Sequence, residues 1–242
     1  MSASWLTWLF VLVMSLPGAS LAQALRSGLQ DMSPALQSMQ KDDSQNPGML
    51  WVQQGQSLFA ERCQACHKAT AMRTVATRFP ALVDGQVRSL AQQLKTCASR
   101  VEPPSALDEA ALLALATYIG YLGRGLALEA VRDPGLQQAL QRGRSLFYQP
   151  MGQLGLSCAQ CHQQNAGKRL AGSLVPQGHP NGYPAYRLEW QGMGSLERRL
   201  RGCMTGVRAE PWAPDSDDAL AMAVFLRHRA AGLPVETPAV RP

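Results

Sequence analysis

The sequence Cys158-Ala159-Gln160-Cys161-His162 decides the fold, and Cys63-Gln64-Ala65-Cys66-His67 repeats its pattern earlier in the chain. Two thiols three residues apart lie on one face of a helical turn, so both can bond to the vinyl groups of a single porphyrin. The histidine that follows can then supply a nitrogen ligand to the iron. Cys-x-x-Cys-His is therefore the pattern of c-type haem attachment, and its two copies predict two covalently bound haem c groups.

The residues expected to hold these groups follow directly from the two motifs. The thioether bonds would be made by Cys63, Cys66, Cys158 and Cys161, and the proximal iron ligands would be His67 and His162. A single motif of this kind could also be a zinc or thiol-redox site. Two copies, at matching places in two similar halves, favour haem.

The chain begins with an apolar segment that has the form of a secretory signal. Residues from Trp5 to Leu16 carry no charge, and small residues follow up to Ala22, where we expect cleavage. The run is shorter than the roughly 20 residues that a membrane-spanning helix needs. We therefore expect residues 1–22 to be a signal peptide, and the mature protein to lie in the periplasm without a membrane span. An uncleaved anchor is the alternative, because no Lys or Arg precedes the apolar run.

Two halves of the mature chain carry the same features in the same order. Each begins with a Gly-x-Ser-Leu-Phe sequence, at Gly55–Phe59 and Gly143–Phe147. Each continues with a haem motif, an aromatic-Pro-Ala sequence, a helix that ends near a further cysteine, and a closing amphipathic helix. This order predicts an all-α fold of two tandem cytochrome c domains, 51–125 and 126–242, behind an N-terminal extension over 23–50.

Shorter elements can be placed from capping and periodicity. Ser33-Pro34 predicts the start of a short helix that runs to about Gln40. Apolar residues at helical spacing predict closing helices over Asp108–Leu122 and Asp217–His228, with core residues on their inner faces. A linker from Gly123 to about Gly135 separates the two halves.

The overall charge points to anionic ligands but not to nucleic acid. The chain holds 23 Lys and Arg against 17 Asp and Glu, a formal net charge of +6. Basic residues do not alternate with aromatic residues, as they would on a nucleic-acid-binding surface. A modest positive charge suits a small anionic substrate or an acidic protein partner.

Two of the six cysteines, Cys97 and Cys203, lie outside the haem motifs, at equivalent places in the two halves. A disulfide between them is one interpretation in an exported protein. Another is that methionine is the distal haem ligand, as is typical of cytochrome c. Met72 lies too close to His67 for that role, and the candidates of the second half are Met151, Met193, Met204 and Met222. We favour a thiolate ligand from each cysteine, because it explains why a cysteine recurs in both halves.

The remaining histidines are weaker candidates for ligands. His228 ends the last predicted helix between two arginines, so we expect it in solvent. His179 lies in a loop of turn residues, and we do not favour it as a haem ligand.

The second half differs from the first in the charge around its further cysteine. Four arginines surround Cys203 where the first half has Gln92, Gln93, Lys95 and Arg100; they are Arg198, Arg199, Arg201 and Arg208. Arg199 precedes Cys203 by one helical turn, so the two side chains lie on the same face. A guanidinium there favours the thiolate form of cysteine and can bind a small dianion through two N–H groups. We expect a functional role for Arg199, and we expect Arg198 and Arg201 to face solvent.

Two stretches carry a resemblance to a known family. The run from Arg198 to Pro211, with its Cys-Met pair and flanking arginines, resembles SoxA, the dihaem subunit of the SoxAX cytochromes of sulfur-oxidising bacteria. The run from Met39 to Val52 resembles the same family. Together with both haem motifs and both further cysteines, the resemblance spans nearly all of the mature chain.

The resemblance implies specific roles for the site residues. His67 and Cys97 would be the axial ligands of the first haem, and His162 and Cys203 those of the second. Cys203 would also be the catalytic cysteine, which the family carries as a persulfide, and Arg199 would bind the substrate.

The resemblance also implies an activity, that of L-cysteine S-thiosulfotransferase. SoxAX joins thiosulfate oxidatively to a cysteine of the carrier protein SoxYZ in the periplasm, and passes two electrons to c-type cytochromes. SoxX, a small monohaem cytochrome, would be the partner in a heterodimer. One alternative is a thiosulfate dehydrogenase, which forms tetrathionate without a protein carrier. A second is a pure electron-transfer cytochrome, which would need Met or His as distal ligands and no Arg199. A dihaem peroxidase is less favoured, because the second half keeps a candidate distal ligand.

Overall fold

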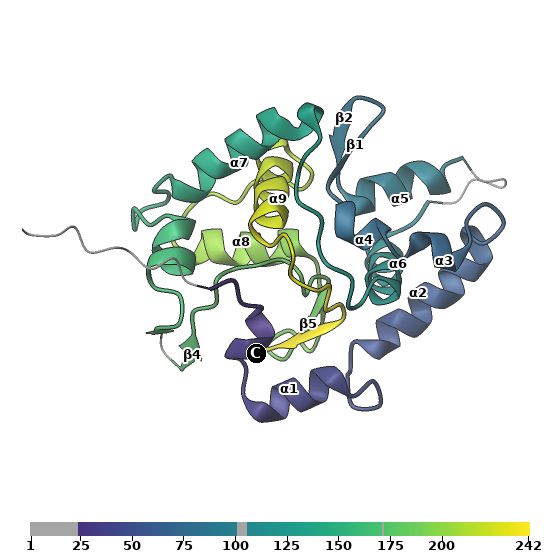
Figure 1. Ribbon diagram of the computed structural model, residues 1–242, viewed down its shortest axis with the longest axis horizontal. Coiled ribbons are helices and arrows are strands. Elements are labelled where there is room, and N and C mark those ends of the chain that lie inside the picture. The colour runs from purple at the N-terminus through teal and green to yellow at the C-terminus, as the bar shows by residue number, and fades with distance from the viewer. Residues whose placement is uncertain (1–23, 101–105, 171) are drawn as a thin grey trace, which may run out of the picture.

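The computed structural model describes residues 24–100, 106–170 and 172–242 (Figure 1). The predicted signal peptide lies outside the described residues. The described chain is mostly helical, and none of its helices is long and apolar enough to cross a membrane. The predicted all-α fold with an internal repeat is confirmed by the arrangement of these helices.

The helices fall into an N-terminal extension and two halves. They are α1 (Pro34–Lys41) in the extension, α2 (Met49–Arg62), α3 (Ala69–Met72), α4 (Val75–Arg78), α5 (Leu90–Ala98) and α6 (Glu109–Leu122) in the first half, and α7 (Gln137–Tyr148), α8 (Leu196–Gly206) and α9 (Asp217–Arg229) in the second. Two short 3₁₀-helices, η1 (Gly28–Asp31) and η2 (Pro134–Leu136), and one π-helical turn, η3 (Gln160–Gln164), complete the helical elements of the described chain. Helix α2 begins at Met49, ahead of the domain boundary predicted at residue 51.

In both halves, the first and last helices cross at a glycine. A Cβ on Gly55 of α2 would lie 2.1 Å from the backbone oxygen of Ala114 in α6. A Cβ on Gly143 of α7 would likewise lie 2.0 Å from the backbone oxygen of Ala221 in α9. Only glycine allows helices to approach this closely. The recurring Gly-x-Ser-Leu-Phe sequence therefore marks the helix crossing in each half.

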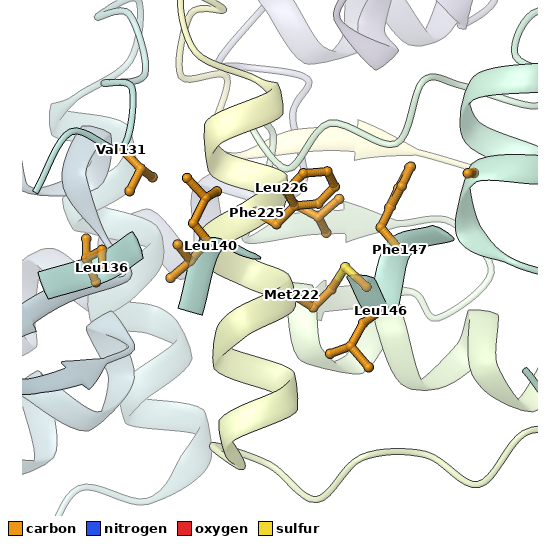
Figure 2. Packing of buried hydrophobic residues seen from close by; sticks show 10 residues of the cluster. Val131, Leu136, Leu140, Leu146, Phe147, Met222, Phe225 and Leu226 are labelled. Atoms are coloured by element: carbon orange, nitrogen blue, oxygen red, sulfur yellow. The ribbon is translucent and has the colours of Figure 1, made fainter. Parts of the chain in front are cut away.

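An aromatic pair packs beside each crossing. The rings of Phe59 and Tyr118 lie 5.6 Å apart in the first half, and those of Phe147 and Phe225 lie 5.3 Å apart in the second. Figure 2 shows Phe147 beside α9 with Phe225 and Met222 in the same apolar layer. Met222 is fully buried. It belongs to the core of the second half.

Serine caps place the helices that carry the two further cysteines. The side chain of Ser89 accepts a hydrogen bond from the backbone N–H of Gln92 at the start of α5. Ser195 does the same for Arg198 at the start of α8. Because both helices begin at the same point of the repeat, they bring Cys97 and Cys203 to equivalent positions.

Short strands, which the sequence did not predict, join these helices. They are β1 (Ala81–Val83), β2 (Gln86–Arg88), β3 (Arg169–Leu170), β4 (Ser173–Leu174), β5 (Ala185–Arg187), β6 (Gly192–Gly194) and β7 (Ala239–Arg241). The first four form two antiparallel hairpins, and β5 pairs with β6 antiparallel and with β7 in parallel. Runs of two or three residues are too short for a strand's alternating pattern to appear in the sequence.

The N-terminal extension binds to the C-terminal strand. The side chain of Gln40 accepts a hydrogen bond of 3.1 Å from the backbone N–H of Val240. Asn46 donates one of 2.9 Å to the backbone oxygen of Pro238. Figure 1 shows α1 near the C-terminus, although the two lie at opposite ends of the described chain. The N-terminal extension thus packs against the C-terminal segment of the second half.

Candidate functional site

Helix α8 brings Cys203 close to the haem motif of its own half. Burial raises the pKa of the Cys158 thiol to about 11, and the nearby Cys203 sulfur contributes to the same shift. None of the six cysteines, all of which lie in the described part of the chain, forms a disulfide, so the interpretation of a Cys97–Cys203 disulfide is wrong. The structure therefore places the predicted distal ligand next to the first cysteine of the second motif.

His162, the predicted proximal ligand, is already oriented. Its Nδ1 lies 2.8 Å from the backbone oxygen of Pro176, and an N–H donated there leaves the lone pair on Nε2. Metal-bound histidines usually have their second nitrogen fixed in this way. Burial lowers the pKa of His162, and the Pro176 hydrogen bond opposes this effect. A neutral imidazole with a free Nε2 is the form that binds iron.

A glycine provides the space for this imidazole. Gly178 has φ = +73°, and a Cβ there would lie 2.8 Å from Cγ of His162 and 2.9 Å from its Nδ1. A side chain at this position would displace the ring. The loop over residues 176–178 thus fits closely around His162 and holds it in one orientation.

The first half repeats the arrangement with different neighbours. Burial raises the pKa of Cys63, with further contributions from the Cys97 and Cys66 sulfurs. Gln93 donates a hydrogen bond of 3.4 Å from its Nε2 to Sγ of Cys97. His67 is exposed at the surface. Cys97 therefore lies beside the first motif, as Cys203 lies beside the second.

These residues have the chemistry that haem c needs. Each half offers two free thiols in a Cys-x-x-Cys-His turn, an imidazole, and a third thiol close to the first cysteine. The second half adds the oriented ring of His162 and the glycine beside it. The donor set fits one covalently held haem in each half.

Arg199 lies close enough to this site for its charge to affect the pKa of groups there. Its side chain is 36% exposed, and its Nη1 is 3.9 Å from Oε1 of Glu189. Its charge acts to lower the pKa of both His162 and Tyr183, and the Cys203 sulfur also influences Tyr183. Burial is the main effect on Tyr183 and raises its pKa. The structure thus gathers a half-exposed cation and a phenol around Cys203.

The other arginines of this region have separate positions. The guanidinium of Arg198 stacks 4.1 Å above the ring of Trp190, so this exposed side chain has a fixed partner that the sequence did not predict. Arg201 is exposed. Arg208 follows α8 with φ = +57° and lines a cavity of about 600 Å³ together with Arg142 and Trp212. Neither Arg199 nor Cys203 lines that cavity.

Two partly buried groups lie near His162, and the position of neither was predicted from the sequence. Arg229 stacks 4.3 Å from the ring of Phe147 and donates a hydrogen bond of 3.1 Å to the backbone oxygen of Gln177. Burial, reinforced by Arg229, lowers the pKa of His179 to about 4. Arg229 lies one turn after the buried Phe225, and that spacing could have shown that it faces inward. His228 is exposed, as expected.

The methionines considered as distal ligands occupy other places. Met204 and Met193 are buried, as is Met222 in the core of the second half. Met151 forms an isolated bridge with Leu156.

The comparisons with known proteins agree on one family. The SoxA/TsdA cytochrome c domain family matches residues 49–128 and 142–235. The chain is 35% identical over 214 residues to an L-cysteine S-thiosulfotransferase subunit SoxA of Pseudaminobacter salicylatoxidans, covering 83% of this chain and 75% of that protein. It is 31% identical to the SoxA subunit of Rhodovulum sulfidophilum, over 90% of this chain and 80% of that one.

A solved structure shows the same fold. A chain of the SoxXA crystal structure from P. pantotrophus superposes with a TM-score of 0.85 at 27% sequence identity. The match covers 90% of this chain and 87% of that chain. The similarity therefore includes both haem domains and their arrangement.

Proposed function

Because the chain belongs to the SoxA/TsdA family of c-type cytochromes, we propose that it acts as the dihaem subunit of an L-cysteine S-thiosulfotransferase. Its substrates would be thiosulfate and a cysteine of a SoxYZ-type carrier protein. A SoxX-type monohaem cytochrome would complete a heterodimer in the periplasm. The names of the relatives and the solved SoxXA complex support this proposal.

The observation that carries the proposal is the contrast between Arg199 and Gln93. Both residues precede the further cysteine of their half by one helical turn. Gln93 is hydrogen-bonded to Cys97, whereas Arg199 is a half-exposed cation near Cys203 and Tyr183. Thiosulfate is a dianion, and an accessible guanidinium can bind two of its oxygens at once. We therefore assign substrate binding to Arg199 and the catalytic sulfur to Cys203.

The proposed reaction forms one S–S bond. The sulfane sulfur of thiosulfate bonds to the carrier's cysteine sulfur, the thiol proton passes to water, and two electrons pass to c-type cytochromes. Cys203 offers a sulfur that can exchange with the sulfane sulfur, as in thiol–disulfide chemistry. Arg199 neutralises and orients the dianion, and the partly buried Tyr183 lies near both Arg199 and Cys203.

Haem c would supply the one-electron acceptance that this oxidation needs. We propose two haem groups, each held by two thioether bonds and two axial ligands. The first would be held by Cys63, Cys66, His67 and Cys97, and the second by Cys158, Cys161, His162 and Cys203.

Mass spectrometry of the carrier tests the proposal. The haem-loaded complex with its monohaem partner, incubated with thiosulfate, carrier and oxidised cytochrome c, should leave a thiosulfate adduct on the carrier cysteine. The variant Cys203→Ala should leave the carrier unmodified. Full modification by this variant would remove Cys203 from the catalytic role.

A thiosulfate dehydrogenase is the second candidate, because the matching family includes TsdA as well as SoxA. That activity joins two thiosulfate ions and needs no carrier. Tetrathionate produced at the same rate with and without carrier, and an unmodified carrier, would favour this candidate over the first.

A further inference from the structure

The β5–β6 hairpin ends in a tight tip that faces α8. The strands pair as far as Arg187 and Gly192, and residues 188–191 connect them. The tip is closed by hydrogen bonds from Trp190 N to Arg187 O, at 3.1 Å, and from Gln191 N to Leu188 O, at 3.2 Å. A tip that is bonded to itself in this way presents its side chains in fixed directions.

Two consecutive side chains of this tip hold two consecutive arginines of α8. Oε1 of Glu189 lies 3.9 Å from Nη1 of Arg199. The ring of Trp190 lies 4.1 Å below the guanidinium of Arg198. The hairpin tip therefore contacts the helix that carries Cys203 through the residue to which we assign substrate binding.

Glu189 is itself fixed to the scaffold. Its Oε1 accepts a hydrogen bond of 2.7 Å from Nε of Arg187, whose side chain is only 10% exposed. The Arg187 guanidinium also lies 5.0 Å from the ring of Trp190. One carboxylate oxygen is thus shared between a short bond to a buried arginine and a longer contact with a half-exposed one. The longer contact is weak enough for an arriving dianion to compete with it.

The first half contains a counterpart of this contact. Arg88, at the end of the β1–β2 hairpin, donates a hydrogen bond of 3.4 Å to the side-chain oxygen of Gln93. In both halves a hairpin residue therefore contacts the side chain one turn before the cysteine. The two contacts differ in chemistry. In the first half the cation Arg88 contacts the neutral amide of Gln93, and in the second the carboxylate of Glu189 contacts the cation Arg199. The two contacts come from different places in the repeat, because Arg88 directly precedes the cap Ser89, whereas Glu189 lies at the hairpin tip, six residues before the cap Ser195.

We infer that Glu189 is a positioning residue for Arg199: it holds the guanidinium towards the anion site until thiosulfate takes its place. This inference rests on the proposed function for the identity of the anion. An arginine side chain has many rotamers, and a partner that restricts them lowers the entropy lost when substrate binds. The hydrogen bond from Arg187 keeps Glu189 in place beside Arg199.

Thiosulfate binding and steady-state kinetics of the haem-loaded complex test this inference. Glu189→Ala should raise both the thiosulfate Kd, measured by calorimetry, and KM by about two- to fivefold, with kcat unchanged. Glu189→Gln keeps an oxygen that can accept from both arginines, so it should show a smaller increase. A decrease in KM for either variant would mean that Glu189 only repels the anion, which would overturn the inference.

A double-mutant cycle separates positioning from a direct effect. In an Arg199→Ala background, Glu189→Ala should add nothing to the loss of thiosulfate affinity, because the residue it positions is gone. An equal increase in both backgrounds would show that Glu189 acts independently of Arg199. Glu197→Gln is the matched control, since it removes a negative charge next to Arg198 on the same helix. The inference would also be wrong if this control raised Kd as much as Glu189→Gln does.

A failure of the proposed function can be distinguished from a failure of this inference, because the two are measured by different experiments. If the wild-type complex did not modify the carrier, the thiosulfate-transfer assignment would fail. The calorimetric cycle would still report whether Glu189 and Arg199 are coupled in thiosulfate binding.

Discussion

Gln93 donates its side-chain amide to the sulfur of Cys97 across 3.4 Å, one turn apart on helix α5. The residue at this position in the second half is Arg199, which contacts Glu189 on the hairpin ahead of its helix. The same backbone thus supports two different groups next to two equivalent cysteines. In the first half the group stabilises the sulfur, and in the second it is available to an anion. We interpret this difference as the point at which the two halves of the repeat acquired separate roles.

Replacing Gln93 with leucine should lower the reduction potential of the first haem. A hydrogen bond to a thiolate ligand withdraws electron density, and its loss makes the iron harder to reduce. We expect a decrease on the order of 50 mV, the one-electron equivalent of about 1 kcal/mol. Redox titration of the complex measures both haems together, so the second haem serves as the internal control. Equal shifts in both, or none, would contradict the assignment of Cys97.

Two replacements of Arg199 should distinguish the effect of its positive charge on thiosulfate binding from the effect of its planar guanidinium shape. Arg199→Gln removes the cation and should lower kcat/KM for thiosulfate by about 10- to 100-fold, the usual effect of losing hydrogen bonds to a charged group. Arg199→Lys keeps the charge but cannot bind two oxygens in one plane, so its loss should be smaller. Arg201→Gln removes the same charge from an exposed position of α8 and is the control. Equal losses for Arg201→Gln and Arg199→Gln would indicate a general charge effect.

Gly178→Ala should disturb the second haem site. The new Cβ would lie within 3 Å of the His162 ring, and the positive φ adds backbone strain. We expect the haem content to fall from two towards one per chain, measured from the haem absorbance of purified protein. Gly167→Ala is a matched control, because Gly167 also has a positive φ (+84°) but has open space around it. Equal haem loss in both variants would mean that strain, and not the contact with His162, is responsible.

Gly143→Ala should destabilise the second half strongly. Its Cβ would lie 2.0 Å from the backbone oxygen of Ala221, so α7 and α9 would have to move apart. Overpacking of this kind costs about 1–3 kcal/mol or more, which urea unfolding can measure. Gly202→Ala, within α8 and with no atom near the new Cβ, should instead be neutral or stabilising by up to about 1 kcal/mol. A tolerated Gly143→Ala would show that the helix crossing is looser than the structure indicates.

The contact of the extension with α6 should depend on pH. Asp43 accepts hydrogen bonds from Arg124, at 2.6 and 2.8 Å, and from Tyr121, at 3.0 Å. The Arg124 hydrogen bond is the main reason that the pKa of Asp43 lies below its ordinary value of 3.8. A lowered carboxyl pKa stabilises the fold above the ordinary value, and the gain is lost as the pH falls through the lowered one.

Asp43→Asn should therefore destabilise the protein at pH 7 and have little effect at pH 2–3. The two side chains of the ion pair are each 35% exposed, so the expected loss at pH 7 is only about 0.5 kcal/mol. Urea unfolding at both pH values measures the difference. A loss of the same size at low pH would show that the charge of Asp43 is not responsible.

Much of the fold could be predicted because its signals recur in the two halves. The Gly-x-Ser-Leu-Phe sequence, the haem motif and the serine cap appear twice, and each has a local physical reason. The predicted closing helices begin at their caps, Asp108 and Ser216, and end within a residue of the predicted positions. Local capping and periodicity determine such boundaries.

The neighbours of the site could not be predicted in the same way. Glu189 and Trp190 reach Arg199 and Arg198 only because a hairpin with three-residue strands turns back towards α8. Neither the strands nor the turn has a strong sequence signal, since Gln191 adopts a positive φ without being glycine. Contacts between segments that are separate in sequence depend on packing, which spacing alone does not reveal.

The bond between Gln40 and Val240 joins residues 200 positions apart. A chain that is synthesised from its N-terminus therefore presents both haem motifs before it presents the strand that contacts the N-terminal extension. The contact is one of several that join the N-terminal extension to the C-terminal segment across about 200 residues, and the entropy lost in closing so long a loop is recovered only when the strand is in place. Chain order thus makes this closure a late event of maturation, after the residues that receive the haem groups have already emerged.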